Sequence, residues 1–139
     1  MDSIRIYELM ANLLIVLVSV LGFMRGLEWV VRSNEVLKDS SDIYIKLSQF
    51  MDIDTLGWLL IIGSIVLFIS VFVKKETGYI LLVIGGFSVG TCFLMYGMIS
   101  VETATLLSTY YTMISIGLYG YVLASIGGIA LWKTRKKKN

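Results

Sequence analysis

The sequence offers few side chains that could catalyse a reaction or hold a metal ion. It contains no histidine, and Cys92 is its only cysteine. Zinc sites are built from cysteine and histidine, and neither a Cys-His nor a Ser-His catalytic arrangement can be formed without histidine. Cys92 itself is better explained as a small buried apolar side chain than as a reactive thiol. We therefore expect no enzyme activity, no cofactor and no metal.

Several polar side chains do lie within long apolar stretches, where they could line a path for a solute. They are Ser88, Thr91, Cys92, Ser115, Tyr119 and Ser125. Hydroxyls in such positions usually form hydrogen bonds with backbone carbonyls or with a neighbouring helix. A transporter coupled to ions or protons normally holds a carboxylate, a histidine or a lysine within the bilayer, and these stretches contain none. A small uncoupled transporter is therefore the third functional hypothesis.

The elements that carry these residues follow from the distribution of charge. The 12 basic and 10 acidic residues all lie outside four stretches, Leu9–Met24, Thr55–Val73, Thr77–Val101 and Thr103–Trp132. A water-soluble fold needs polar groups wherever its surface meets solvent, whereas a bilayer excludes charge from its centre. A helix needs about 20 residues to cross the hydrocarbon, which the second and third stretches match and the fourth exceeds. The first stretch is short, but Ile4, Ile6 and Tyr7 can extend it. The sequence predicts an all-α integral membrane protein with four transmembrane helices in an antiparallel bundle.

The chain has room for one unit, a single four-span membrane domain covering residues 1–139. We place its spans at about 6–25, 55–73, 78–99 and 105–132, following the apolar stretches and the interfacial aromatic residues. Residues 26–54 then form a loop on one side of the membrane, and residues 133–139 form a basic tail.

The loops predict the orientation of these spans. Eight lysine and arginine residues fall on the side that holds both termini, and four fall on the side of the 26–54 loop. Because basic residues accumulate in cytoplasmic loops, both termini are expected in the cytoplasm of a cell-membrane protein. The alternative is a cleaved signal peptide at residues 1–23, which would leave three spans. The acidic residues Asp2 and Glu8 beside Arg5, and the lack of a small-x-small cleavage site, argue against it.

The external loop contains a segment with the pattern of a short amphipathic helix. At 100° per residue, five apolar side chains fall within an arc of about 120°. They are Ile43, Tyr44, Leu47, Phe50 and Met51. This helix would lie on the bilayer or cap the bundle; the functional alternative is an external docking face for a partner.

Small residues mark the third and fourth spans as packing surfaces. Gly86 and Gly90 form a GxxxG motif, and the spacing repeats as Gly120, Ala124 and Gly128. Small side chains let helices approach closely in lipid, so these two spans are expected to pack against each other. If the small-residue surfaces of the two spans are not fully covered within the chain, the uncovered surface predicts a homo-oligomer or a second membrane protein as partner. The small residues of the second span are too dispersed for an assignment.

The basic tail is expected to hold the end of the last span in the cytoplasm. Its cations are Lys133, Arg135, Lys136, Lys137 and Lys138. Each could also attract anionic lipid by about 1 kcal/mol near the membrane surface. A net charge of only +2 gives no reason to expect nucleic acid as a partner.

These features predict a non-enzymatic accessory protein that stabilises, regulates or protects a membrane complex, as immunity proteins protect a membrane from a toxin. Its partners would be the bilayer and a membrane protein or a second copy of itself. The alternative is a pore-forming oligomer that permeabilises the membrane. Holin-like proteins resemble this chain in layout, being small, multi-span and basic at the C-terminus, and the resemblance implies such an activity.

Overall fold

The computed structural model describes residues 3–31, 53–103 and 107–139. Within these ranges the chain forms four α-helices: α1 (Ser3–Val31), α4 (Ile53–Phe72), α5 (Lys75–Thr103) and α6 (Leu107–Lys138). Each contains a segment long and apolar enough to cross a membrane. The expected all-helical, multi-pass membrane class is thereby confirmed. The amphipathic segment predicted around Ile43–Met51 lies outside the described residues.

The outer helices extend beyond the charge-free stretches. α1 continues through Arg25 and Glu28, whose side chains form an ion pair of 3.6 Å across one helical turn. α6 continues through the basic segment to Lys138, so most of what the sequence suggested as a tail is helical. Lysine and arginine are good helix formers, and cations at a helix C-terminus interact favourably with the helix dipole.

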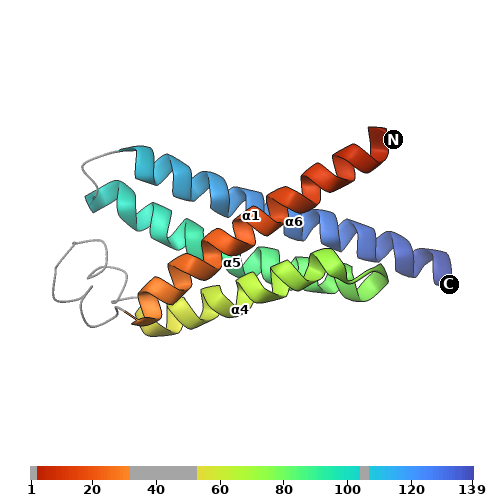
Figure 1. Cartoon of the computed structure of the whole chain (residues 1–139), viewed down its shortest axis with the longest axis horizontal. Helices are drawn as coiled ribbons and strands as arrows, with labels where there is room; N and C mark the ends of the chain where they lie inside the picture. Colours follow the sequence, from red (N-terminus) through yellow and green to blue (C-terminus); the bar gives the residue numbers. More distant parts are fainter. Residues whose placement is uncertain (1–2, 32–52, 104–106) are drawn as a thin grey trace.

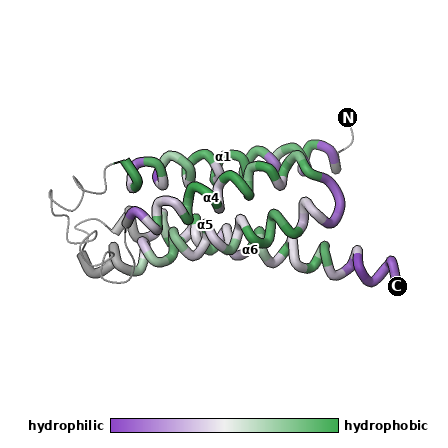
Figure 2. Tube along the Cα trace, turned by 90° about the horizontal axis from the view of Figure 1, so that it is seen from below, coloured by the Kyte–Doolittle hydropathy of each residue, from purple (hydrophilic) through white to green (hydrophobic). Residues whose placement is uncertain are grey.

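The helices form a two-layered bundle with two distinct ends. Figure 2 shows α1 and α4 in one layer and α5 and α6 in the other. Both chain termini and the short turn between α4 and α5 lie at the same end, which we call the terminal end (Figure 1). The opposite end, where α1 finishes and α4 begins, is called the loop end.

Contacts between the helices follow their order in the chain, since α1 packs on α4, α4 on α5 and α5 on α6. The two middle helices are the more enclosed. Of the apolar window in α4 and in α5, 39% is buried, compared with 22% in α1 and in α6. Leu60, Leu67 and Val89 lie in the core at this centre. The outer helices therefore leave most of their apolar surface for lipid or another protein.

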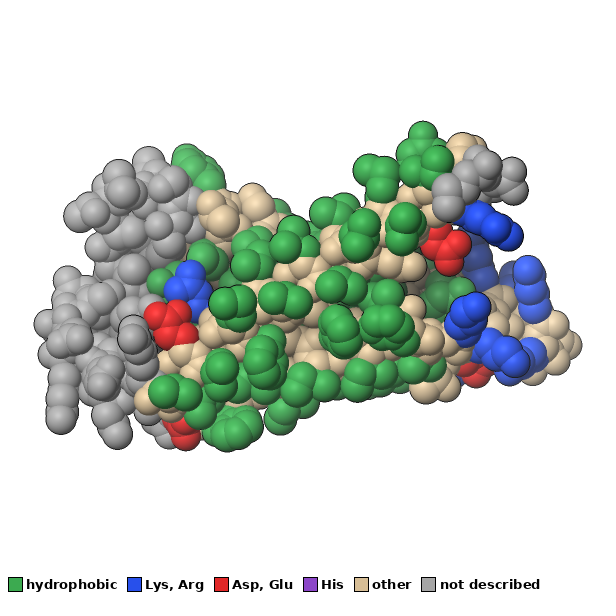
Figure 3. Space-filling model, in the orientation of Figure 1, with side chains coloured by type: hydrophobic (Ala, Val, Ile, Leu, Met, Phe, Trp, Pro, Cys, Tyr) green, Lys and Arg blue, Asp and Glu red, His purple; other side chains and the backbone are tan. Residues whose placement is uncertain are grey.

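Charge and apolar surface are separated along the bundle. Figure 3 shows apolar side chains over the middle of one face, with acidic and basic side chains at its two ends. This is the surface pattern expected of a protein whose middle lies in hydrocarbon and whose ends lie among headgroups.

The turn between α4 and α5 is tight and has an unusual backbone. Lys75 has a φ of 71°, in the left-handed region that side chains other than glycine rarely adopt. Gly78 follows closely, and a Cβ there would overlap the carbonyl oxygen of Val73. This geometry brings Lys74 and Lys75 to the terminal end, beside the first turns of α1.

Candidate functional site

The α5–α6 interface is a contact between backbones. A Cβ built on Gly86 would lie 2.7 Å from the carbonyl oxygen of Gly120, and one built on Gly90 would lie 2.9 Å from that of Gly117. A Cβ on Gly120 would in turn lie 2.8 Å from the carbonyl oxygen of Gly86. No side chain fits in this space, so only glycine allows the two helices to approach so closely.

The contact surface of α6 differs from the predicted one at a single position. Ala124 takes part, since its backbone nitrogen lies 3.1 Å from the Cβ position of Gly86, but Gly128 has no heavy atom within 4 Å of its Cβ position. Gly127 takes its place, with its Cβ position 3.0 Å from the carbonyl oxygen of Tyr79. The contact surface thus runs through residues 117, 120, 124 and 127, at separations of three, four and three. This alternation belongs to helices that cross at a small angle, whereas a strict four-residue repeat drifts away from the partner.

A second close contact, between α1 and α4, was missed from the sequence. A Cβ on Gly26 would lie 2.8 Å from the carbonyl oxygen of Gly57, and one on Gly57 would lie 2.9 Å from that of Gly26. One turn earlier in α1, a Cβ on Gly22 would overlap the Ser64 hydroxyl. The signal was available, because Gly22 and Gly26 form a GxxxG motif at the end of the first span. Gly57 and Ser64 gave no such signal, because they are seven residues apart.

The central pair of helices is joined in the same way. A Cβ on Gly63 of α4 would lie 2.9 Å from the Cβ of Ser88, and one on Gly85 of α5 would lie 2.7 Å from the backbone nitrogen of Leu67. Each of the three helix pairs therefore depends on glycine at its closest point.

Polar side chains within the apolar region are mostly bonded to backbone. The hydroxyls of Thr91, Ser115 and Ser125 each donate to the carbonyl oxygen four residues earlier, at 2.7–2.9 Å. Thr91 also lies 2.8 Å from the Tyr121 hydroxyl on α6. Because the single Thr91 proton is directed to Phe87, Tyr121 is the donor in this second bond. These hydroxyls therefore bond to backbone carbonyls and, for Thr91, to a neighbouring helix, as is usual for hydroxyls within membrane spans.

Ser64 is an exception. Its side chain is 1% exposed, and its hydroxyl has no hydrogen-bond partner among the described residues. Beside it, a small groove of about 230 Å³ lies between α1 and α4 and is lined by Ser19, Phe23 and Phe68 among others. The Ser19 hydroxyl is bonded to the carbonyl oxygen of Ile15 at 2.7 Å.

Aromatic side chains hold α1 against α5 at the loop end. The rings of Trp29 and Tyr96 have their centroids 5.6 Å apart, and the Arg25 guanidinium lies 5.7 Å from the centroid of the Tyr96 ring. Trp29 is 1% exposed. This cluster adds to the glycine contacts and fixes the C-terminal half of α1.

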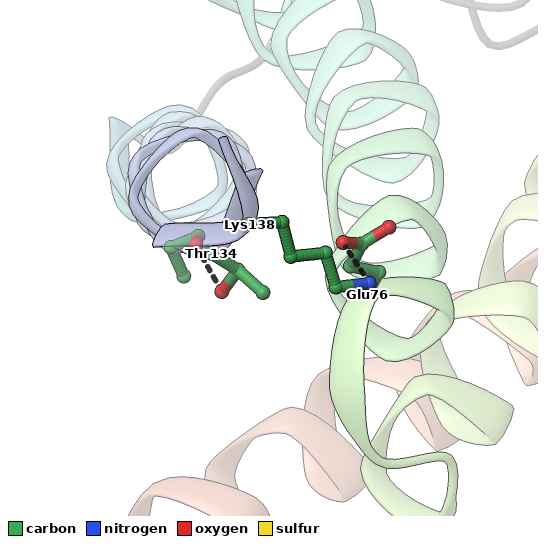
Figure 4. Close-up of polar contacts among 4 residues, drawn as sticks. Glu76, Thr134 and Lys138 are labelled. Carbon is green, nitrogen blue, oxygen red and sulfur yellow. Dashed lines mark hydrogen bonds and ion pairs between the residues drawn. The ribbon is translucent and has the colours of Figure 1, made fainter. Parts of the chain in front are cut away.

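The predicted basic residues gather at the terminal end. Lys138 reaches from the end of α6 to Glu76 at the start of α5, with 2.8 Å between Nζ and Oε1 (Figure 4). On the neighbouring turn, the Thr134 hydroxyl donates to the carbonyl oxygen of Ala130, and Lys136 lies 5.3 Å from the centroid of the Trp132 ring. Lys133, Arg135 and Lys137 are exposed. These cations are placed where headgroups would surround the bundle.

The described residues contain no group of three or more His, Cys, Asp or Glu side chains close enough to hold a metal ion. Comparisons with protein-family models, with curated proteins and with solved structures found no match for this chain. Its function is therefore argued from the helix interfaces and the distribution of charge.

Proposed function

We propose that this chain is a non-enzymatic accessory component of the cell membrane, which stabilises, regulates or protects a membrane complex. It would cross the bilayer four times as an antiparallel bundle with both termini in the cytoplasm. The observation that carries the proposal is the occupation of the glycine surfaces of α5 and α6 by one another. Because these glycine surfaces pack within one chain, they are not available for association with further copies of the chain.

The proposed orientation is supported by the charges at the two ends. The terminal end carries Arg5 in the first turn of α1, Lys74 and Lys75 at the junction of α4 and α5, and the basic end of α6. At the loop end the described residues include Arg25 with Glu28 beside it, and Asp54. Basic residues accumulate on the cytoplasmic side, which favours that side for the terminal end.

The internal filling of the bundle argues against a pore built from several copies. Such a pore would use Gly86, Gly90 and Gly120 between subunits, but their Cβ positions lie within 3 Å of backbone atoms of the same chain. The hydroxyls that would line the pore are bonded within α5 and α6.

A partner would be recognised through the surfaces that remain free. α1 presents a row of exposed apolar side chains, including Leu13, Leu17 and Leu21, along a face that α4 does not cover. The predicted external docking face at Ile43, Tyr44, Leu47, Phe50 and Met51 would provide a second contact outside the membrane.

Reconstitution tests the proposal most directly. Vesicles that contain the purified protein should retain an entrapped dye as well as empty vesicles do. In cells, the chain should co-purify with a membrane complex in fixed stoichiometry under mild detergent, and its deletion should lower the amount or activity of that complex. Dye leakage that increases with protein concentration would overturn the accessory role in favour of a pore.

Reporter fusions test the orientation separately. A reporter enzyme that is active only outside the cytoplasm should be inactive after Asn139 and active when inserted within residues 32–52. The reverse pattern would invert the assignment of the two ends, and activity at both positions would exclude four spans.

A further inference from the structure

The terminal end contains a cavity of about 450 Å³ between α1 and the turn that joins α4 to α5. Its volume lies within the range of about 300–1,000 Å³ found for small-molecule sites. α1 contributes Glu8 and Asn12 to the lining, the turn contributes Lys74, and the start of α5 contributes Lys75. None of these residues is part of the helix interfaces on which the proposed function rests, so the site is an additional feature of the protein.

The closest helix contacts of α1 lie in its C-terminal half, away from the cavity. Its glycine contacts with α4 and its aromatic contact with α5 all lie in its C-terminal half, at Gly22, Gly26 and Trp29. Toward the terminal end α1 diverges from α4 (Figure 1). In Figure 3 a hollow lies beneath this end of α1, with apolar side chains in its depth and charged ones around it.

The polar groups of the cavity carry both signs of charge. Glu8 and Asn12 are four residues apart and therefore share one face of α1, while Lys74 belongs to the turn and Lys75 begins α5. In the described part of the chain, none of these three charged residues forms an ion pair. Glu76, the acidic residue next to Lys75, is paired with Lys138 at the end of α6 instead (Figure 4).

The remainder of the lining is apolar or aromatic. Ile15 of α1 and Leu82 of α5 lie farther from the charged residues along their helices than Asn12 and Tyr79 do, and Ser70 and Val71 belong to the last turn of α4. The Ser70 hydroxyl is already bonded to the carbonyl oxygen of Leu67 at 2.6 Å. A ligand that matches this lining needs a polar part with an anion and a cation, followed by an apolar part directed toward the membrane interior.

We propose that this cavity binds the headgroup of an amine-bearing phospholipid of the phosphatidylethanolamine type. Its phosphate would lie between the ammonium groups of Lys74 and Lys75, and its own ammonium would donate to the Glu8 carboxylate and the Asn12 amide oxygen. The start of the acyl chains would contact Val71 and Leu82. Basic sites between membrane helices bind lipid phosphates in this way, with lysine acting as a point charge.

Glu8 is the residue that decides between lipids. A purely anionic headgroup, such as that of phosphatidylglycerol, would interact with the two lysines but would place no cation near the carboxylate. An amine-bearing headgroup satisfies both. The binding preference should therefore depend on Glu8, and overall binding on the lysines.

The test measures lipid retained by the purified full-length protein. The protein is exchanged into mixed micelles with equal amounts of phosphatidylethanolamine and phosphatidylglycerol of the same acyl chains, and the bound lipid is counted by native mass spectrometry. The wild-type chain should retain the amine-bearing lipid about tenfold better, as expected for one charge-assisted contact. E8Q should abolish this preference, and K74Q with K75Q should lower retention of both lipids by about tenfold or more.

The matched control is K133Q with K137Q, which removes the same charge from the same end without altering the cavity. It should keep the wild-type preference, and far-UV circular dichroism should show equal helicity in all variants. Soluble phosphoethanolamine should compete poorly, because it lacks the apolar part. Equal retention of the two lipids by the wild-type chain, or a preference that survives E8Q, would overturn the proposal. Competition by soluble phosphoethanolamine as strong as that by the lipid would also overturn it, in favour of a site for a water-soluble ligand.

Discussion

The α5–α6 and α1–α4 pairs use the same kind of contact over very different lengths. Between α5 and α6, glycine contacts extend from Gly127 against Tyr79 near the terminal end to Gly97 against Ile114 near the loop end. Between α1 and α4 they are limited to the C-terminal half of α1, at Gly22 and Gly26, which meet Ser64 and Gly57 of α4. Glycine contacts therefore extend along most of the first pair, and in the second pair they cover only half of α1.

This difference separates two tasks within one small bundle. A complete glycine surface fixes two helices against each other along their length. A partial one fixes half of α1 and lets its other half diverge, and the cavity that contains Glu8 and Lys74 lies where the contact stops. The α5–α6 pair thus stabilises the bundle, whereas the divergence of α1 from α4 leaves room for the cavity.

The largest expected effect is that of a large side chain at the centre of the complete interface. In Gly86→Leu the new Cβ would meet the carbonyl oxygen of Gly120 at 2.7 Å, so the backbones must separate. We expect a loss of about 3 kcal/mol in unfolding free energy, at the upper end of the cost of overpacking. Reversible unfolding in mixed micelles of mild and denaturing detergent, followed by circular dichroism, measures it.

Gly128→Leu is the matched control on α6. It is the same substitution in a neighbouring helix, but no atom lies within 4 Å of the Cβ position. Its unfolding free energy should remain within about 0.5 kcal/mol of the wild type, as for other substitutions away from packed sites. Equal losses in the two variants would mean that Gly128 packs as tightly as Gly86 and would refute the α6 surface described above.

A smaller effect is expected at the partial interface. In Gly26→Ala the added methyl group would lie 2.8 Å from the carbonyl oxygen of Gly57, but α1 diverges from α4 toward its N-terminus and can tilt to relieve the contact. We expect a loss of about 1 kcal/mol, at the lower end of the range for overpacking. If Gly26→Ala costs as much as Gly86→Leu under the same conditions, the two interfaces do not differ in the way described here.

Features of this structure could be predicted from the sequence where they depend on the bilayer or on helices that are adjacent in the chain. The four long apolar helices could be predicted because a bilayer imposes the same exclusion of charge on every span. Gly86, Gly90 and Gly120 could be assigned to one interface because the short connection between α5 and α6 makes these helices neighbours.

The α1–α4 contact, the role of Gly127 and the cavity depend on which helix surfaces face one another. This pairing cannot be predicted from individual residues. The role of Gly57 and Ser64 depends on the position of α1, and the role of Gly127 rather than Gly128 depends on which side of α6 faces α5. The cavity was invisible for the same reason. Glu8 and Lys74 are far apart in the sequence, and only the divergence of α1 from α4 brings them to one site.

The hydrogen bond between Thr91 and Tyr121 should contribute less than the glycine contacts of the same helix pair. A double-mutant cycle of Thr91→Val and Tyr121→Phe isolates it, since both substitutions nearly conserve volume. We expect a coupling of about 0.6 kcal/mol, the average for such bonds in membrane helices. A coupling near zero in mixed-micelle unfolding would mean that close packing alone holds α5 against α6.

The smallest expected effect belongs to Ser64, and it tests why the partial interface is looser. Ser64→Ala removes a buried hydroxyl that has no hydrogen-bond partner among the described residues, so the unfolding free energy should stay within about 0.5 kcal/mol of the wild type. The same hydroxyl is the only atom that a methyl group on Gly22 would overlap, since the next nearest atoms lie at 3.5 and 3.6 Å. Gly22→Ala should therefore be destabilising alone and nearly neutral together with Ser64→Ala. The complete interface allows no such rescue, because a Cβ at Gly86 meets backbone that no substitution can remove. A double variant as unstable as Gly22→Ala alone would show that backbone, rather than one side chain, limits the approach of α1 to α4.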